Sequence, residues 1–413
     1  MKKYFLAVAS FFIYSHISLG QVYPGQMDST FVPVRSHHYD PELTFDFCVN
    51  EPAWNNQAGI HSAFGSTDRL YFRKEVPVNH NNDLSSSYST TVWRGERANA
   101  QILVWSSEAL EQVRVSTQDL RSAEGNIIPK DRITFELVRY VLSNYPYAEK
   151  KAICGESPYK SGFLMPDRFE TLDRFDLPSQ TTRPVWMMVD VPRGTAPGTY
   201  KGQVEVRAKG KAPQLLNLEI VVQKQLLPYP KDWKYRLDLW QNPWAVAWYN
   251  HVEPWSPEHK MLLKQHLKHY ADAGGTYITT YGVHSPWSDN SYMIEGGMIE
   301  WIKKADGTWA FDYKIFDEYV ELAMECGIDE AITLYTPIPW GFRHRYKDEA
   351  TGDYSYINWA PSSEEFKKMW NIFLTDFKFH LEAKSWLDIT YIGINENPME
   401  ETLAAIHVVR NHD

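Results

Sequence analysis

The sequence predicts a multidomain β plus α/β protein. An N-terminal β-sandwich comes first, and a (β/α)8 barrel of the TIM type follows, of which about the first four strands are present. Residues 21–228 contain short apolar strands bounded by Gly and Pro turns. Residues 231–413 instead alternate strands with amphipathic helices, which is typical of a parallel sheet. The stiff segment Pro228-Tyr229-Pro230 separates the two patterns.

Residues 21–228 show the alternation expected of sheets with one buried face. The segments 199–208 and 216–222 place apolar residues at every second position. The segments 91–93 and 101–105 flank a polar turn at 94–97, and residues 186–191 form a further strand. We expect this region to be a supporting sandwich without chemistry of its own.

The C-terminal region begins a strand-helix repeat but is short for a complete barrel. Strands are predicted at 235–240, 277–283, 332–335 and 390–394. Helices are predicted from Pro257 after an N-cap at Ser256, from about Asp312, and after a capping box of Ser362 and Glu365. Only 183 residues follow Pro230 (413 − 230), whereas a barrel takes about 250. Strands five to eight are therefore expected to be missing, and the sequence is expected to be a fragment.

Composition and short motifs exclude several classes of protein. The formal net charge is −10 and no long basic run is present, which argues against a nucleic-acid partner. No HExxH, P-loop or zinc-type cysteine pattern occurs, so neither a metal nor a cofactor is predicted. Residues 1–20 have the basic start and apolar run of a signal peptide. We expect export to the periplasm or the outside, with no transmembrane anchor in the mature chain.

Tryptophan is concentrated in the loops that follow the predicted strands. Twelve of the 16 Trp lie in residues 231–413. Eight fall in the predicted loops 241–255, 284–311 and 336–361, namely Trp244, Trp248, Trp255, Trp287, Trp301, Trp309, Trp340 and Trp359. Barrels bind ligands at this face, and aromatic rings stack on sugar rings. The sequence therefore predicts a sugar-binding cleft walled by these side chains.

The same face supplies candidate substrate-binding residues. Strand parity points Asp238 and Trp240 inward on the first strand, and His284 shares the inward parity of the second. Amides that follow strand one and aromatic residues in the later loops complete the set, which comprises Asp238, Trp240, Gln241, Asn242, His284, Trp287, Tyr335 and Trp340.

The strongest catalytic candidates are Asn395 and Glu396. They end the apolar segment 391–394, and a carboxylate at the carboxyl end of a barrel strand is typically catalytic. An acid at this position suits proton transfer to and from a glycosidic oxygen. The sequence therefore predicts glycoside hydrolysis with Glu396 as the acid and base.

Several segments resemble glycoside hydrolase family 123. They are residues 237–243 (LDLWQNP), 306–309 with 311–313, and Glu396 with 398–400; residues 93–97 and 197–202 are similar to the N-terminal domain of that family. The resemblance implies an enzyme that removes terminal β-linked N-acetylgalactosamine, or a related N-acetylhexosamine, from glycans or glycosphingolipids. It also implies a substrate-assisted mechanism, in which the substrate acetamide forms an oxazoline intermediate and the β configuration is retained.

The resemblance departs at two positions beside the predicted acid. Asn395 stands where the family has Asp, and Asn397 where it usually has Arg. An Asp at this position orients the acetamide N–H and offsets developing positive charge. Asn395 is expected to accept the same hydrogen bond through its carbonyl oxygen, without the charge.

Two alternatives remain open. The Asn395-Glu396 pair also fits retaining glycosidases in which Asn holds the 2-hydroxyl group and a second carboxylate, expected on strand seven, is the nucleophile. A non-catalytic glycan-binding relative would keep the aromatic cleft without turnover.

Overall fold

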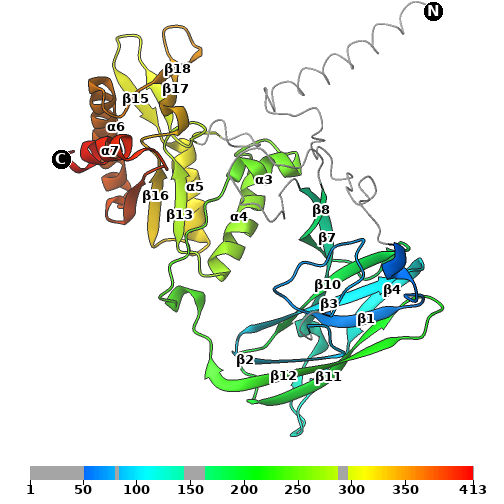
Figure 1. The fold of residues 1–413 in the computed structure, drawn as a ribbon. Helices are drawn as coiled ribbons and strands as arrows, with labels where there is room; N and C mark the ends of the chain where they lie inside the picture. Colours follow the sequence, from blue (N-terminus) through cyan, green and yellow to red (C-terminus); the bar gives the residue numbers. More distant parts are fainter. Residues whose placement is uncertain (1–50, 80–82, 144–162, 287–295, 413) are drawn as a thin grey trace, which may run out of the picture. The chain divides into compact units, whose positions relative to one another are not determined.

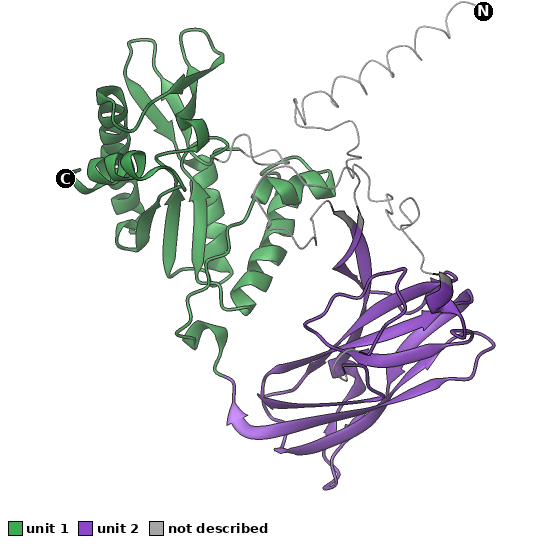
Figure 2. Ribbon diagram, viewed as in Figure 1, with its two compact units in different colours: residues 1–27, 228–413 green, residues 28–227 purple. Residues whose placement is uncertain are grey.

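The computed structural model describes residues 51–79, 83–143, 163–286 and 296–412. The predicted signal peptide and Trp287 lie outside these ranges. The chain divides into two compact units (Figure 2): unit 2 is Asp28–Leu227, and unit 1 comprises Met1–Met27 with Pro228–Asp413. The change of unit coincides with the Pro-rich segment that begins at Pro228.

Unit 2 is built almost wholly from strands. They are β1 His61–Gly65, β2 Ser87–Arg94, β3 Arg97–Ser106, β4 Leu110–Thr117, β5 Leu120–Arg121, β6 Ile127–Ile128, β7 Ile133–Ser143, β8 Phe163–Glu170, β9 Phe175–Leu177, β10 Thr181–Asp190, β11 Gly198–Arg207 and β12 Gln214–Leu226, with 3-10 turns η1 Glu51–Trp54 and η2 Lys130–Arg132. One sheet has the order β1-β3-β10-β7-β8. The other has the order β2-β12-β11-β4-β9, with β5 and β6 joined to β11.

The two sheets of unit 2 enclose one apolar core (Figure 1). The alternating residues of β11 and β12 supply much of it, and Tyr200, Val204 and Ile220 have no exposed surface. The turn at 94–97 links β2 in one sheet to β3 in the other, with Gly95 in the left-handed region (φ 85°). The prediction of an N-terminal β-sheet domain is therefore confirmed for the described residues.

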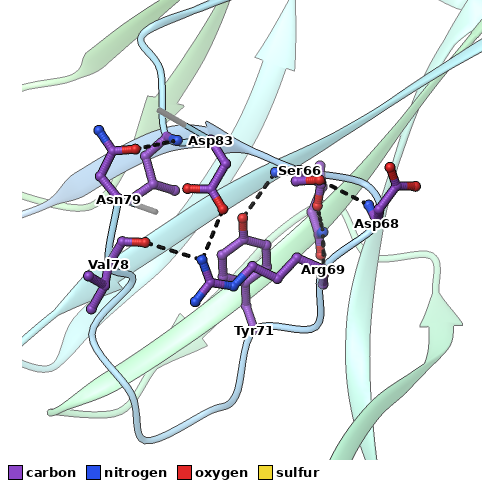
Figure 3. A network of polar contacts seen from close by, with 9 residues as sticks. Ser66, Asp68, Arg69, Tyr71, Val78, Asn79 and Asp83 are labelled. Carbon is purple, nitrogen blue, oxygen red and sulfur yellow. Dashed lines mark hydrogen bonds and ion pairs between the residues drawn. The ribbon is translucent and has the colours of Figure 1, made fainter. Parts of the chain in front are cut away.

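A network of hydrogen bonds and an ion pair stabilises the long connection between β1 and β2 (Figure 3). Arg69 Nη1 donates to Asp83 Oδ2 at 2.9 Å, and the Ser66 N–H donates to the Tyr71 hydroxyl at 3.0 Å. Asn79 Oδ1 accepts from the backbone N–H of Leu84 at 3.1 Å. These partners belong to the connection itself, which indicates a structural rather than a ligand-binding role.

Unit 1 combines five α-helices with two small sheets in its described part. The helices are α3 Pro243–Asn250, α4 Pro257–Asp272, α5 Lys314–Glu325, α6 Glu364–Lys384 and α7 Met399–Arg410, and the 3-10 turns are η3 Pro230–Asp232, η4 Trp340–Phe342 and η5 Leu387–Ile389. The strands are β13 Tyr277–Tyr281, β14 Glu300–Lys303, β15 Trp309–Asp312, β16 Ala331–Tyr335, β17 Arg343–Asp348, β18 Tyr354–Asn358 and β19 Thr390–Gly393.

The first sheet of unit 1 is parallel and has the order β13-β16-β19. Its register aligns Tyr281, Tyr335 and Gly393 at the carboxyl ends of the three strands. Helix α5 connects towards β16 and α6 towards β19 (Figure 1). Strand-helix repetition is thus confirmed here, and the eight-stranded barrel stays a prediction.

The prediction of a regular first strand at 235–240 was wrong. Only one parallel bridge forms, between Leu237 and Gly275, and Tyr235 and Leu239 are exposed. The Tyr270 hydroxyl of α4 lies 2.7 Å from the Leu237 carbonyl oxygen and accepts the Leu239 N–H at 3.1 Å. A side chain therefore satisfies backbone groups that a regular strand pair would otherwise use.

The predicted helix starts lie within two residues of the observed ones, and α5 begins at Lys314 rather than at about Asp312. Ser256 caps α4 by accepting the His259 N–H. The cap of α6 is Ser363, which accepts the Phe366 N–H, rather than the predicted Ser362. Both helices bury the apolar faces that their periodicity predicts, because tertiary packing selects the 3.6-residue stripe.

The second sheet of unit 1 was not predicted. Its order is β15-β14-β17-β18, and its strands come from the segments read as long loops after β13 and β16. β14 pairs in parallel with β17, whereas the outer pairs are antiparallel. This sheet changes the interpretation of the tryptophans.

Most of the eight loop tryptophans fill the core rather than wall a cleft. Trp244, Trp301 and Trp359 are buried, while Trp255 and Trp309 pack against the same cluster. Trp301 stacks on Phe373 of α6 with ring centroids 4.8 Å apart. The cleft interpretation was therefore wrong for these five, because the supposed loops form helix α3 and a second sheet whose side chains join the core of the parallel sheet.

Candidate active site

The candidate site lies at the carboxyl ends of the parallel strands, where β16 and β19 bring Tyr335 and Asn395 together. The Tyr335 hydroxyl donates to Asn395 Oδ1 at 2.6 Å, and the backbone N–H of Glu396 donates to the same oxygen at 2.8 Å. The Asn395 N–H in turn donates to Thr336 Oγ1 at 3.1 Å. Three hydrogen bonds thus hold Asn395, which is only 5% exposed.

These contacts determine which way the Asn395 amide faces. A backbone N–H only donates, so the atom that receives the Glu396 N–H is the oxygen. That oxygen already accepts two hydrogen bonds. The amide nitrogen Nδ2 is buried and has no hydrogen-bond partner among the described residues. The group left to meet a ligand is therefore a donor, whereas the sequence led us to expect a carbonyl acceptor.

Glu396 follows Asn395 directly and is exposed. The buried Asn395 thus anchors the backbone, and the Glu396 carboxylate beside it is accessible at the end of the strand. Proton transfer to a bound molecule requires such a held and accessible group. Asn397 supports the turn from the other side, because its Nδ2 donates to the carbonyl oxygen of Ile338 at 3.1 Å. The link joins the β19 end to the segment after β16.

The segment before α3 contributes one aromatic wall. Trp240 is 54% exposed, and its ring lies 4.9 Å from the ring of Tyr335 between centroids. Trp240, Tyr335, Asn395 and Glu396 therefore form one chain of contacts from three separate segments. An exposed indole can stack on an apolar sugar face.

Asp238 lies near the start of the same segment. Its Oδ1 accepts from Thr279 Oγ1 of β13 at 3.2 Å, and burial raises the pKa of the carboxyl group. The hydrogen bond therefore joins Asp238 to the parallel sheet rather than to Glu396.

Gln241 and Asn242 both accept hydrogen bonds that support the local structure. The Gln241 carbonyl oxygen accepts from the Tyr281 hydroxyl at 2.6 Å. Asn242 caps α3, where its Oδ1 accepts the Ala245 N–H at 3.3 Å. Their predicted reading of sugar hydroxyl groups stays a prediction.

His284 and Trp340 lie on the two segments that follow β13 and β16. The Trp340 N–H donates to the carbonyl oxygen of Pro286 at 2.9 Å, which joins these segments. Burial, with the positive charges of Arg345 and Arg343, lowers the pKa of His284 to about 3. His284 is therefore neutral near pH 7, and its ring can exchange hydrogen bonds with a neutral ligand. Trp340 is 39% exposed.

Sequence reasoning missed Thr336 and the bracing role of Asn397. Thr336 is fully buried and supports Asn395. The only available signal was a polar residue directly after a predicted strand. In the described ranges no three His, Cys, Asp or Glu side chains are grouped to hold a metal ion. No helix in the described part of the chain has the length and apolar character that crossing a membrane requires.

Comparisons with known proteins agree on one family. The model of the glycoside hydrolase 123 catalytic domain matches residues 240–413, and that of the glycoside hydrolase 123 N-terminal domain matches residues 64–208. A search of curated proteins gave no match.

A family 123 glycoside hydrolase from Clostridium perfringens, studied for glycolipid glycan hydrolysis, has a similar structure. Its TM-score is 0.76 at 26% identity, over 86% of this chain and 61% of that chain. The present chain thus spans about three fifths of that protein. A Bacteroides ovatus GH5 xyloglucanase (10% identity, 79% of this chain and 61% of that one) and PapD-like domain 7 of human CEP192 (14%, 34% and 82%) have TM-scores of 0.20, too low to support an argument.

Proposed function

The chain belongs to glycoside hydrolase family 123, and from this premise we propose that it removes terminal β-linked N-acetylgalactosamine, or a related N-acetylhexosamine, from glycans such as those of glycolipids. The observation that carries the proposal is the exposed Glu396 directly after the buried Asn395, at the edge where β13, β16 and β19 end. The Clostridium relative supports the glycolipid substrate class. Export through residues 1–20 is part of the proposal.

The proposed reaction uses one protein carboxyl group twice. Protonated Glu396 gives its proton to the glycosidic oxygen, while the substrate acetamide oxygen attacks the anomeric carbon and the aglycone leaves as an alcohol. Glu396, now a carboxylate, removes a proton from water, and the resulting hydroxide oxygen opens the oxazolinium ring at the anomeric carbon. Two displacements return the β configuration. Trp240 stacks on the sugar, and Tyr335 positions Asn395.

We further propose that the parallel strands belong to a (β/α)8 barrel. The parallel order β13-β16-β19, the helices α5 and α6 between strands, and the Leu237–Gly275 bridge beside β13 support this. In such a barrel the ends of the strands face one common cleft.

The proposal is tested by replacing Glu396 with Gln in the full chain. Loss of the proton donor and acceptor is expected to lower kcat on an aryl N-acetyl-β-galactosaminide by about 10²- to 10⁴-fold. Glu400→Gln is the matched control, because Glu400 is an exposed carboxylate at the start of α7. Equal rates for the Glu396→Gln variant and the unaltered chain would contradict the proposal.

A specific observation also favours a second candidate, a two-carboxylate retaining glycosidase. The unpartnered Nδ2 of Asn395 is a donor, which suits the oxygen of a sugar 2-hydroxyl group better than an acetamide N–H. Such an enzyme would form a covalent glycosyl intermediate. A 2-fluoroglycoside that labels the chain, detected by intact mass, would select this candidate; absence of labelling with turnover of the N-acetyl substrate would select the first.

A further inference from the structure

The hairpin of β17 and β18 carries a basic and aromatic face. Along β17, Arg343, Arg345 and Lys347 alternate with His344, which is buried in the core. The register pairs Arg345 with Tyr356. Directly paired residues share a face of the sheet, so the basic residues of β17 and the tyrosines of β18 lie on the side away from the core.

Each arginine on this face lies over a tyrosine ring. The Arg343 Cζ atom is 3.8 Å from the ring centroid of Tyr356, and that of Arg345 is 4.2 Å from the ring centroid of Tyr354. The rings hold the planar guanidinium groups and leave their edge N–H donors for other partners. The guanidinium groups of Arg343 and Arg345 thus lie two residues apart on β17.

Carboxylates in the described part of the chain only weakly neutralise the guanidinium groups of Arg343 and Arg345. Within the described ranges Arg343 has no ion pair, and the one pair of Arg345 is with Glu300 at 3.8 Å, longer than a hydrogen bond. The other Glu300 oxygen accepts from the Tyr354 hydroxyl at 3.0 Å. Arg345 Nε is buried and has no hydrogen-bond partner among the described residues. In a chain of net charge −10, this is a local excess of positive charge.

The hairpin adjoins the candidate site. It begins directly after the turn Trp340–Phe342, whose Trp340 N–H is bonded to Pro286 after β13. The positive charges of Arg345 and Arg343 also add to burial in lowering the pKa of His284, which lies in the segment after β13.

We infer that the Arg343–Arg345 face binds an anionic group, a carboxylate or a sulfate ester, on the glycan whose terminal sugar is held at the strand ends. Guanidinium forks bind such groups with paired, charge-assisted hydrogen bonds. The partly exposed indole of Trp340 offers a stacking surface for the sugar that carries the anion. The inference rests on the proposed function and narrows its substrates to acidic glycans.

A structural role for the same charges is the competing explanation. β18 is an edge strand, and charged residues protect edges from pairing with other chains. A lysine would serve that purpose equally, whereas paired recognition of an anion needs the guanidinium fork. Arg343→Lys therefore distinguishes charge from geometry.

The experiment compares three oligosaccharides that end in β-linked N-acetylgalactosamine: one neutral, one with sialic acid on the adjoining sugar, and one with a sulfate ester there. For the full chain we expect kcat/KM to be about tenfold higher for an acidic than for the neutral substrate, which is the gain of one charge-assisted bond. Arg343→Gln should bring this ratio close to one, and Arg343→Lys should restore only part of it. Preference for one acidic substrate identifies carboxylate or sulfate.

Lys368→Gln provides the control, because it removes one exposed charge from α6 and should leave the ratio unchanged. A ratio of one in the unaltered chain, or a ratio that Arg343→Gln does not alter, overturns the inference. If no substrate is hydrolysed, the proposed function fails separately. Saturation-transfer NMR with the same oligosaccharides then decides the inference: acid-selective binding that Arg343→Gln abolishes supports it, and equal signals overturn it.

Discussion

The two sheets of unit 1 differ in how they are encoded and in what they do. The parallel sheet β13-β16-β19 has strands with clear apolar patterns, and it positions Asn395 and Glu396 at its edge. The sheet β15-β14-β17-β18 comes from segments that read as polar loops rich in Trp. Tryptophan in the segment after a strand therefore does not by itself indicate a sugar-binding cleft, because such a segment can form a second sheet that buries the tryptophan in its core.

The largest effect on stability is expected at Trp301 in that second sheet. Trp301 is 2% exposed, and its indole N–H donates to the Gly282 carbonyl oxygen at 2.9 Å. Trp301→Ala should cost about 3–5 kcal/mol, because it leaves a cavity and an unpaired carbonyl. Trp340→Ala, at a partly exposed ring, should cost less than about 1 kcal/mol and lower activity instead. Urea unfolding of both variants checks this; equal destabilisation would break the distinction between core and cleft aromatics.

A smaller effect is expected from pH, through histidines that the second sheet and its neighbours keep neutral. Burial lowers the pKa of His344 to about 4, and burial with two arginines lowers that of His284 to about 3. An unfolded His titrates near pH 6.5, so below that pH the unfolded chain binds protons that the folded chain does not. Stability is therefore full above about pH 6.5 and declines as the pH falls towards the folded values.

At about pH 5 the loss should be on the order of 1–2 kcal/mol for each histidine. Urea unfolding of unit 1, followed by Trp fluorescence at about pH 7.5 and pH 5, measures it. His344→Gln should flatten the pH dependence whatever its effect on absolute stability. An unchanged slope in that variant would show that His344 does not titrate as its burial implies.

The smallest effect is expected from Asn395→Asp, which sharpens the account of the parallel-sheet site. One carboxylate oxygen would keep the bonds from Tyr335 and Glu396, and the other would replace Nδ2 as an acceptor for the acetamide N–H. A charge-assisted bond is roughly twice as strong as a neutral one, so kcat/KM for an N-acetyl substrate should rise about tenfold. A fall in kcat/KM confined to a substrate with a 2-hydroxyl group would instead favour the second candidate, in which Asn395 Nδ2 donates to that hydroxyl group.

The sequence predicted those parts of the molecule that depend on local pattern. The Ser256 cap, the buried stripe of α6 and the strand that ends at Gly393 are all visible in short windows. The position of Glu396 followed from that strand end. The second sheet was not predictable in this way, because β14 and β17 are about forty residues apart and share only two register pairs.

The contacts of the site required the register as well. The Tyr335–Asn395 hydrogen bond exists because β16 and β19 align Tyr335 with Gly393. The same alignment lets the Tyr335 hydroxyl donate to the Asn395 side-chain oxygen, which the sequence led us to expect as an acceptor for the substrate. The irregular path of 237–239 escaped prediction because its backbone groups are satisfied by the distant side chain of Tyr270.

The most direct test of the account is to compare two aryl β-galactosides that differ only in the substituent at the second carbon, acetamido or hydroxyl. The substrate-assisted reaction predicts that the full chain hydrolyses the acetamido compound with a kcat/KM at least about 100-fold higher, because only that substrate supplies its own nucleophile. Equal kcat/KM values for the two compounds would contradict it, since the acetamide would then have no part in the reaction.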